Sequence, residues 1–220
     1  MSLYRPATDP KYQTGDPPQA AVVPPDTIVS PDTLRPNRLP DGQHRTRKWP
    51  VLHATSVPAI DVATWSLTID GLVERTLNIT LPEFQALPRC RVFADFHCVT
   101  TWSRLGNLWE GVSVRTLVEQ CGIRPESQFV EVFACDSGWT TNLPLAHLLQ
   151  DDVLLADTHD GLALDADHGG PVRLIVPQLF AWKSAKWVHR ITLTAENRPG
   201  HWERAGYHDV GDPWKGERRR

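Results

Sequence analysis

From about residue 60 onwards, the chain consists of short strand-like runs that end in turn residues. Residues 64–69 alternate between polar and apolar side chains and stop at Asp70-Gly71, and residues 187–194 alternate in the same way. A period of two is typical of half-buried strands. This pattern favours a mixed α+β fold with largely antiparallel or mixed sheets. Further strands are predicted at residues 90–97, 128–135, 139–143, 153–156 and 172–176.

The predicted helices are few and short. Thr80 and Glu83 have the spacing of a capping box, with Pro82 in the first turn, and predict a helix to about Leu87. Ser113 can cap a helix over residues 114–121. Another short helix is expected from Pro144. Strands outnumber helices, as the α+β class requires.

Proline divides the chain into two parts. Ten of the 19 prolines fall within residues 1–50, where no helical or strand period is sustained. Proline fixes the backbone and removes a hydrogen-bond donor, so this composition favours an extended segment. We expect an arm at residues 1–48 that packs on a domain at residues 49–220, with Trp49 as one apolar anchor.

Charge and hydropathy exclude several classes of protein. The chain carries 23 basic and 26 acidic residues, a net charge of −3, whereas a general nucleic-acid binder is usually basic. No apolar run approaches the ~20 residues that span a bilayer, and the N-terminus lacks a signal-peptide pattern. We therefore expect a cytoplasmic protein without a membrane span. Neither a dinucleotide-binding nor a P-loop glycine motif is present.

Three clusters could carry chemistry. Cys98 ends a predicted strand and leads into a polar and aromatic loop, where its thiol is either a buried apolar group or a ligand for a soft metal. Arg173 interrupts an apolar strand after a glycine-rich turn, and needs either an anion or an ion pair with Asp165 or Asp167. The segment 182–187 places two lysines and a serine between tryptophans, either as a phosphate site or as a solvated loop.

Together these clusters resemble the sulfite-oxidase-type molybdopterin fold. This family includes sulfite oxidases, plant-type assimilatory nitrate reductases and the catalytic subunit of bacterial methionine-sulfoxide reductase. The resemblance spans roughly residues 50–195, and the compact size is most similar to bacterial sulfite oxidase-like oxidoreductases with a single catalytic domain. It is carried, in family order, by His97-Cys98-Val99-Thr100-x-Trp102-Ser103, Trp109-Glu110-Gly111-Val112, Asp167-His168-Gly169-Gly170-Pro171-Val172-Arg173-x-x-Val176-Pro177 and Lys183-Ser184-Ala185-Lys186-Trp187.

The resemblance implies a molybdenum-molybdopterin cofactor (Mo-MPT) and its contacts. Cys98 is then the thiolate ligand of molybdenum, a role that suits a soft, electron-rich sulfur. His53 falls near another cofactor contact, and Cys135 or Asp136 near a further one. The remaining positions that match pterin-binding residues of the family are His168, Arg173, Ser184, Ala185 and Lys186.

The same resemblance implies an oxidoreductase that transfers an oxygen atom or two electrons on a small oxyanion or an S- or N-oxide. Electrons would be exchanged with a separate haem or flavin protein, since no haem, flavin or iron–sulfur ligand set is visible in the sequence. Trp102 and Arg104 are expected to line the open face of the metal, with Lys183 as another candidate cation. The sequence differs from sulfite oxidases after the cysteine, so sulfite is not singled out.

Two other interpretations remain open. Cys98 could serve a zinc- or thiol-dependent hydrolase together with His97 or His201, although neighbouring side chains on a strand point to opposite faces, which makes His97 a poor partner. The chain could also bind the pterin without turnover, as a non-catalytic module.

Overall fold

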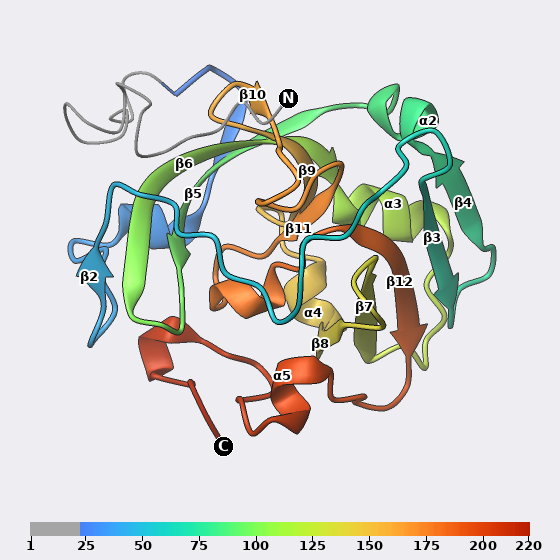
Figure 1. Ribbon diagram of the computed structural model, residues 1–220. Helices are drawn as coiled ribbons and strands as arrows, with labels where there is room; N and C mark the ends of the chain where they lie inside the picture. Colours follow the sequence, from blue (N-terminus) through green and yellow to red (C-terminus); the bar gives the residue numbers. More distant parts are fainter. Residues whose placement is uncertain (1–22) are drawn as a thin grey trace.

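The computed structural model describes residues 23–220, and its strands form two sheets (Figure 1). In the larger, seven-stranded sheet the order is β1-β5-β6-β9-β10, with β2 beside β6 and β11 beside β9. Both parallel and antiparallel pairs occur, so the sheet is mixed. Its strands are β1 (Thr27–Val29), β2 (His44–Arg45), β5 (Cys90–His97), β6 (Trp102–Ser113), β9 (Leu154–His159), β10 (Leu162–Ala163) and β11 (Arg173–Ile175).

The smaller sheet has five strands in the order β4-β3-β12-β7-β8. Its central strand pairs in parallel with β3 and antiparallel with β7. All five strands lie in segments from residue 64 onwards, where the alternating pattern begins. The strands are β3 (Ser66–Gly71), β4 (Leu77–Thr80), β7 (Phe129–Ala134), β8 (Thr140–Pro144) and β12 (Val188–Thr194).

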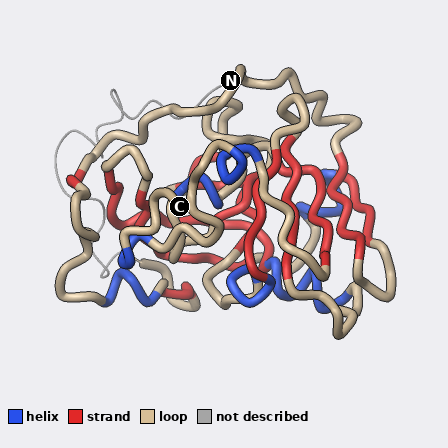
Figure 2. The backbone as a smooth tube through the Cα atoms, turned by 90° about the horizontal axis from the view of Figure 1, so that it is seen from below, coloured by secondary structure: helices blue, strands red, loops and turns tan. Residues whose placement is uncertain are grey.

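Short helices surround the sheets, and long loops join them (Figure 2). The predicted capping box is confirmed, because the Thr80 N–H donates to Glu83 Oε2 at 2.8 Å. The Ser113 cap is confirmed as well, since its hydroxyl accepts from the Thr116 N–H. The helices are α2 (Leu81–Gln85), α3 (Val114–Gln120), α4 (Leu145–Leu148) and α5 (His201–Arg204), with 3-10 turns at Pro31–Leu34, Ala181–Lys183 and Pro213–Lys215. No helix among residues 23–220 is both long and apolar enough to cross a membrane.

Strand β6 is the main departure from the sequence expectation, which placed a loop after Cys98. It runs for 12 residues and pairs with β5 on one side and with β9 on the other. Gly111 lies where β9 approaches closely, and a Cβ there would sit 1.9 Å from the Leu155 carbonyl oxygen. Pairing on both sides holds β6 together even though its glycines interrupt the alternation.

The N-terminal segment joins the larger sheet. Residues 27–29 form β1 beside β5, and the Ser30 hydroxyl donates to the buried carboxylate of Asp152 at 2.7 Å. The predicted arm at residues 1–48 is therefore continuous with the sheet in its described part, and residues 1–22 lie outside the described residues. The boundary expected at residue 48 falls just after β2.

Two groups of buried side chains form the core. The first lies between the smaller sheet, α3 and the strands β9 and β11, and includes Leu67, Leu117 and Leu174. The second belongs to the larger sheet and includes Trp49, Phe96 and Cys98. The proposed metal ligand thus sits at the edge of an aromatic core.

Candidate active site

Cys98 stands in a tight turn between β5 and β6. Its N–H donates to the Trp102 carbonyl at 2.8 Å, and its own carbonyl accepts from the Thr101 N–H at 3.0 Å. Thr101 has a φ of +75°, a left-handed conformation that the turn imposes on a non-glycine residue. The thiol is 8% exposed and lies 3.1 Å from the Thr100 hydroxyl. Burial raises the pKa of the Cys98 thiol, and the Thr100 hydrogen bond opposes that shift.

A cavity of about 250 Å³ opens beside this turn. Many of its walls are aromatic, which suits a flat, partly apolar ligand. Its lining residues come from segments far apart in the chain, between Trp49 and Tyr207. Of the predicted site residues, the cavity lining includes His53, Cys98, Trp102, Arg173, Ser184, Ala185 and Lys186.

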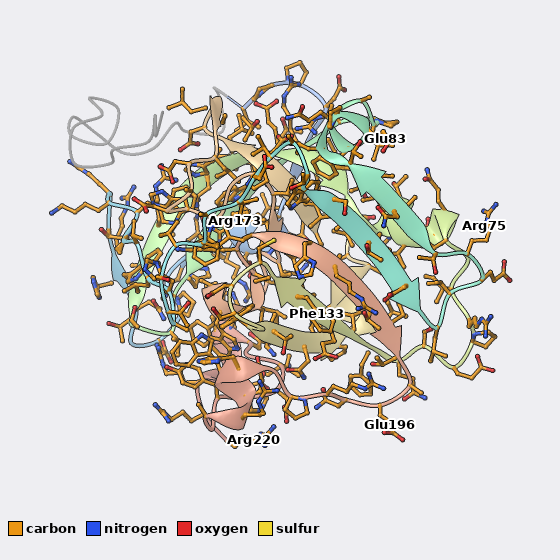
Figure 3. The ribbon with its side chains drawn as sticks, turned by 45° about the vertical axis from the view of Figure 1, so that its right-hand side comes forward. Arg75, Glu83, Phe133, Arg173, Glu196 and Arg220 are labelled. Atoms are coloured by element: carbon orange, nitrogen blue, oxygen red, sulfur yellow. The ribbon has the colours of Figure 1, made fainter. Side chains whose placement is uncertain are left out.

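Arg173, on β11, brings a desolvated cation to this cavity. Its guanidinium donates to the carbonyl oxygens of His168 at 2.7 Å and Ser184 at 3.0 Å, and its Nε has no hydrogen-bond partner among the described residues. Burial lowers the pKa of Arg173 to about 9, although the charge of Asp165 opposes this. Figure 3 shows Arg173 inside the molecule, in contrast to Glu196 and Arg220 at its periphery. Of the two interpretations of this residue, the structure favours a bound anion over an ion pair.

Lys186 lies beside Arg173 on the same cavity. Its ammonium donates to the Asp167 carbonyl at 2.6 Å and lies 5.2 Å from the centre of the Trp187 ring. Desolvation, and then the charge of Arg173, lower the pKa of Lys186 to about 7. Gly169, with a φ of +105°, packs against the Lys186 side chain, where a Cβ would lie 2.9 Å from Lys186 Cβ. The glycine-rich turn and the lysine segment of the sequence therefore form one wall.

Ser184 and Ala185 occupy this wall in different ways. The Ser184 hydroxyl accepts from the Val176 N–H at 2.9 Å, so it helps to join the wall to the end of β11. Ala185 is buried, and its carbonyl accepts from the Leu174 N–H at 2.8 Å. On another side, the exposed His53 ring lies 6.0 Å from the Trp187 ring.

Asp136, rather than Cys135, lines the cavity. Its buried carboxylate accepts a hydrogen bond from the Thr55 hydroxyl, which ties the loop after His53 to the β7–β8 turn. Cys135 is half-buried, packs against the first core group and is not among the residues that line the cavity. Of the two residues that the sequence left open, the structure places Asp136 at the cavity.

His168, which was expected to contact the cofactor, is not among the residues that line the cavity. Its Nδ1 lies 2.8 Å from Asp165 Oδ1, and its Nε2 lies 3.2 Å from the Trp49 carbonyl oxygen. The His168 ring packs on the Trp49 ring at a centroid separation of 4.0 Å. Because the His168 carbonyl accepts a hydrogen bond from Arg173, His168 positions that arginine from outside the cavity lining.

Arg104 also lies away from the cavity, contrary to expectation. Although it is 1% exposed, its guanidinium donates to Asp160 Oδ2 at 2.7 Å and to the Asn107 side chain. Lys183 is likewise held elsewhere, by an ion pair of 2.6 Å with the buried Glu203. Both cations are therefore paired with carboxylates, and neither is among the residues that line the cavity beside Cys98.

Trp102 lines the cavity, and its indole Nε1 has no hydrogen-bond partner among the described residues. The structure adds a residue that the sequence did not single out. Tyr207 lines the same cavity, with its ring 5.3 Å from Trp182 and 5.1 Å from Trp202. It follows α5 in an irregular segment, where no periodicity gave a signal.

These residues fit a molybdopterin cofactor. A soft sulfur, flat aromatic walls and two cations with lowered pKa values border one cavity. A buried cation without a carboxylate partner is stabilised by an anion such as a phosphate. His97, by contrast, lies outside the cavity lining, with its Nδ1 2.8 Å from the Ser103 hydroxyl oxygen. No group of three potential metal-binding side chains is found in residues 23–220, so the zinc interpretation gains no ligand set there.

Comparisons with known proteins agree with this fit. The family model "Oxidoreductase molybdopterin binding domain" matches residues 54–202. The Bacillus subtilis "Uncharacterized oxidoreductase YuiH" is 44% identical over 182 residues, covering 82% of this chain and 91% of that protein. Sulfite oxidase of Gallus gallus is 28% identical over 180 residues, covering 69% of this chain and 39% of that protein. The crystal structure of the sulfane dehydrogenase SoxCD from Paracoccus pantotrophus matches with a TM-score of 0.62 and 25% identity, covering 66% of this chain and 42% of that chain.

The fold and the site thus define a pterin-dependent redox protein. The chain belongs to the family of oxidoreductases with a molybdopterin-binding domain of the sulfite oxidase type, and Mo-MPT is its cofactor. It spans most of the Bacillus relative but less than half of the sulfite oxidase and the SoxCD chain.

Proposed function

We propose that this protein uses Mo-MPT to reduce a small, uncharged S- or N-oxide, with electrons supplied by a separate redox protein. One observation carries the proposal. Cys98, Arg173 and Lys186 come from three separate segments of the chain and border the same cavity. When bound, the cofactor supplies two-electron and oxygen-atom-transfer chemistry at molybdenum. The four free cysteines are consistent with a reducing, cytoplasmic location, which is part of the proposal.

The residues at the cavity would have separate roles in binding the cofactor. The Cys98 thiolate would hold molybdenum, while Arg173 and Lys186 would neutralise the phosphate of the pterin. Ser184 and Ala185 would form the backbone wall beside that phosphate, and Asp136 would hold the polar edge together with His53. The aromatic rings at the cavity would exclude water from the reacting atoms.

The choice of an uncharged oxide follows from the cavity wall next to Cys98. Val99, Thr100 and Trp102 line this wall without a charged side chain. Arg104 and Lys183, the cations expected there, bind Asp160 and Glu203 instead. An oxyanion would then gain little from the wall, whereas a sulfoxide could rest on the rings and accept a hydrogen bond. Tyr207 is the only tyrosine among the described residues, and its phenol is the candidate donor.

A substrate screen tests this choice. Dimethyl sulfoxide and methionine sulfoxide should turn over with reduced viologen faster than nitrate or chlorate, and sulfite should be a poor donor to ferricyanide. Because these sulfoxides carry no net charge, their kcat/KM should change by less than about twofold with salt. A preference for sulfite or nitrate, with rates that fall steeply as salt is added, would contradict the proposal.

The lowered pKa of Lys186 predicts how cofactor retention depends on pH. A bound phosphate favours the charged ammonium, so above pH 7 binding must be accompanied by proton uptake. We expect cofactor affinity to fall by up to about tenfold for each pH unit above 7, measured by pterin fluorescence after gel filtration. Between pH 7 and 10.5 the folded cofactor-free state binds fewer protons at Lys186 than the unfolded state does. The stability of the cofactor-free protein should therefore rise with pH in that range, opposite to the affinity.

Two variants provide the controls. Lys186→Arg keeps the charge at all these pH values and should remove most of the pH dependence. Lys186→Gln should retain less cofactor at pH 6, and its cofactor affinity should not begin to fall near pH 7. If the cofactor affinity of Lys186→Gln falls above pH 7 as much as that of the wild type, another group causes the pH dependence.

A further inference from the structure

Two basic segments from distant parts of the chain meet at the turn that carries Cys98. Next to β2, the Gln43 side-chain amide donates to the Cys98 carbonyl at 3.0 Å. From the C-terminal segment, the Arg218 guanidinium donates to the Val99 carbonyl at 2.5 Å. The two segments also touch each other, since a Cβ on Gly42 would lie 3.7 Å from Arg218 Nη2. In Figure 1 both β2 and the C-terminus lie on the side of the molecule where β5 ends and β6 begins.

The two segments that meet at this turn, residues 41–48 and 215–220, contain seven basic residues and two acidic ones, Asp41 and Glu217. Arg47, Lys48 and Arg219 are exposed, and neither they nor Arg218 form an ion pair with a described residue. Nearby Lys215 and Arg220, by contrast, are paired with Asp212 and Asp209. We call Arg47, Lys48, Arg218 and Arg219 the basic face. It contrasts with the net charge of −3 for the whole chain.

Exposed apolar residues border the basic face. Val51 is 40% exposed and Leu52 is 51% exposed, three and four residues after Lys48. Leu52 also lines the cavity. Apolar side chains beside a polar, charged rim are typical of protein–protein interfaces. A small anion would be attracted by the cations but would not bury the exposed side chains of Val51 and Leu52.

The turn also gives a short covalent route from the metal ligand to the surface. Thr100 and Thr101 are exposed, and only Val99 separates Cys98 from Thr100. A redox centre that docks on this face would come close to the peptide of the metal ligand.

We propose that the basic face docks an acidic one-electron redox protein, which exchanges electrons through the Cys98 turn. This inference rests on the proposed function, because it assigns the partner that function needs. For each two-electron change at the cofactor, the partner passes or accepts one electron in each of two successive encounters. Complementary charge would raise the association rate more than it changes any later step.

The test compares two charge-reversal variants with the same change in net charge. Arg47→Glu/Lys48→Glu alters the basic face, whereas Arg75→Glu/Arg124→Glu alters exposed arginines elsewhere (Figure 3 labels Arg75). The acceptors are native cytochrome c, which is basic, and lysine-succinylated cytochrome c, which carries the same haem but is acidic. Dithionite-reduced enzyme is mixed with each ferric cytochrome at about 10 mM and about 150 mM ionic strength. Binding to each cytochrome is measured separately by calorimetric titration.

At low salt, Arg47→Glu/Lys48→Glu should slow haem reduction of succinylated cytochrome c by about 10–100-fold and weaken its binding in step. The same variant should speed the reaction with native cytochrome c, and its reaction with uncharged benzoquinone should stay unchanged. The Arg75→Glu/Arg124→Glu variant should differ from wild type by less than about threefold with every acceptor.

If both double variants lose rate and binding equally, net charge causes the effect and the proposed docking face is contradicted. Unchanged rates and binding in Arg47→Glu/Lys48→Glu would overturn it directly. Wild-type protein that cannot be reoxidised even by benzoquinone would contradict the proposed function instead, and the binding titration would then still test the face.

Discussion

Replacing Cys98 by serine should abolish turnover while the protein stays folded. The side chain occupies a turn held by backbone hydrogen bonds, and a serine hydroxyl could bind Thr100 as the thiol does. Serine is a harder ligand than a thiolate, so the electronic properties of molybdenum should change. Loss of a residue that hydrogen-bonds to a metal ligand typically lowers metal affinity or activity by about 10–100-fold. We therefore expect the loss of a direct ligand to lower kcat by more than about 100-fold.

Three measurements on matched protein check this expectation. The visible absorption and the electron paramagnetic resonance signal of the molybdenum should shift or disappear, whereas the melting temperature of the cofactor-free protein should change little. Cys135→Ser is the control, because Cys135 lies between the cavity-lining residues Ala134 and Asp136 yet does not line the cavity itself. A Cys98→Ser enzyme with unchanged spectrum and rate would remove Cys98 from the metal site.

Features that depend on neighbours in sequence could be predicted. The capping box at Thr80 and the serine cap at Ser113 involve residues within three positions, and both were expected from the sequence. The strands with clean alternation, such as β3 and β12, appear where the pattern placed them. The family resemblance covered the segments that meet at the cavity, including Cys98 and the wall around Lys186.

Strand β6 was missed because its stability comes from its neighbours. Gly106, Asn107 and Gly111 interrupt its alternation, and no strand was predicted there. In the structure the Asn107 amide donates to the Ala94 carbonyl of β5 at 3.0 Å, and Gly111 admits the close approach of β9. These contacts are set by sheet order, which short-range patterns do not contain.

The direction of a side chain is the other feature that the sequence left undetermined. Arg104 and Arg173 are both buried arginines on strands, but only Arg173 borders the cavity. The difference lies in Asp160, which follows β9 and is 56 positions from Arg104. Tyr207 was passed over for a similar reason, since only tertiary packing on Trp182 and Trp202 brings it to the site.

Arg104→Met should therefore act on stability and leave the site intact. Arg104 is 1% exposed, and Asp160 is almost as buried, so the variant leaves a buried carboxylate without this cation. Breaking a buried ion pair from one side costs about 3–5 kcal/mol, which should appear as a lower free energy of unfolding in urea. Since the Arg104 side chain does not line the cavity, we expect cofactor content and sulfoxide KM to match wild type below the unfolding range.

The double variant Arg104→Met/Asp160→Asn separates the charge from the packing. It removes the uncompensated carboxylate and should recover part of the lost stability, so the two single effects should not add. If Arg104→Met proves too unstable to purify, Arg104→Lys keeps the charge and should lose less stability, because a lysine cannot reproduce the forked contacts to Asp160 and Asn107. A variant that unfolds like wild type but has a kcat/KM lowered about tenfold would return Arg104 to the active site. That outcome would require its side chain to leave Asp160 and reach the cavity beside Cys98.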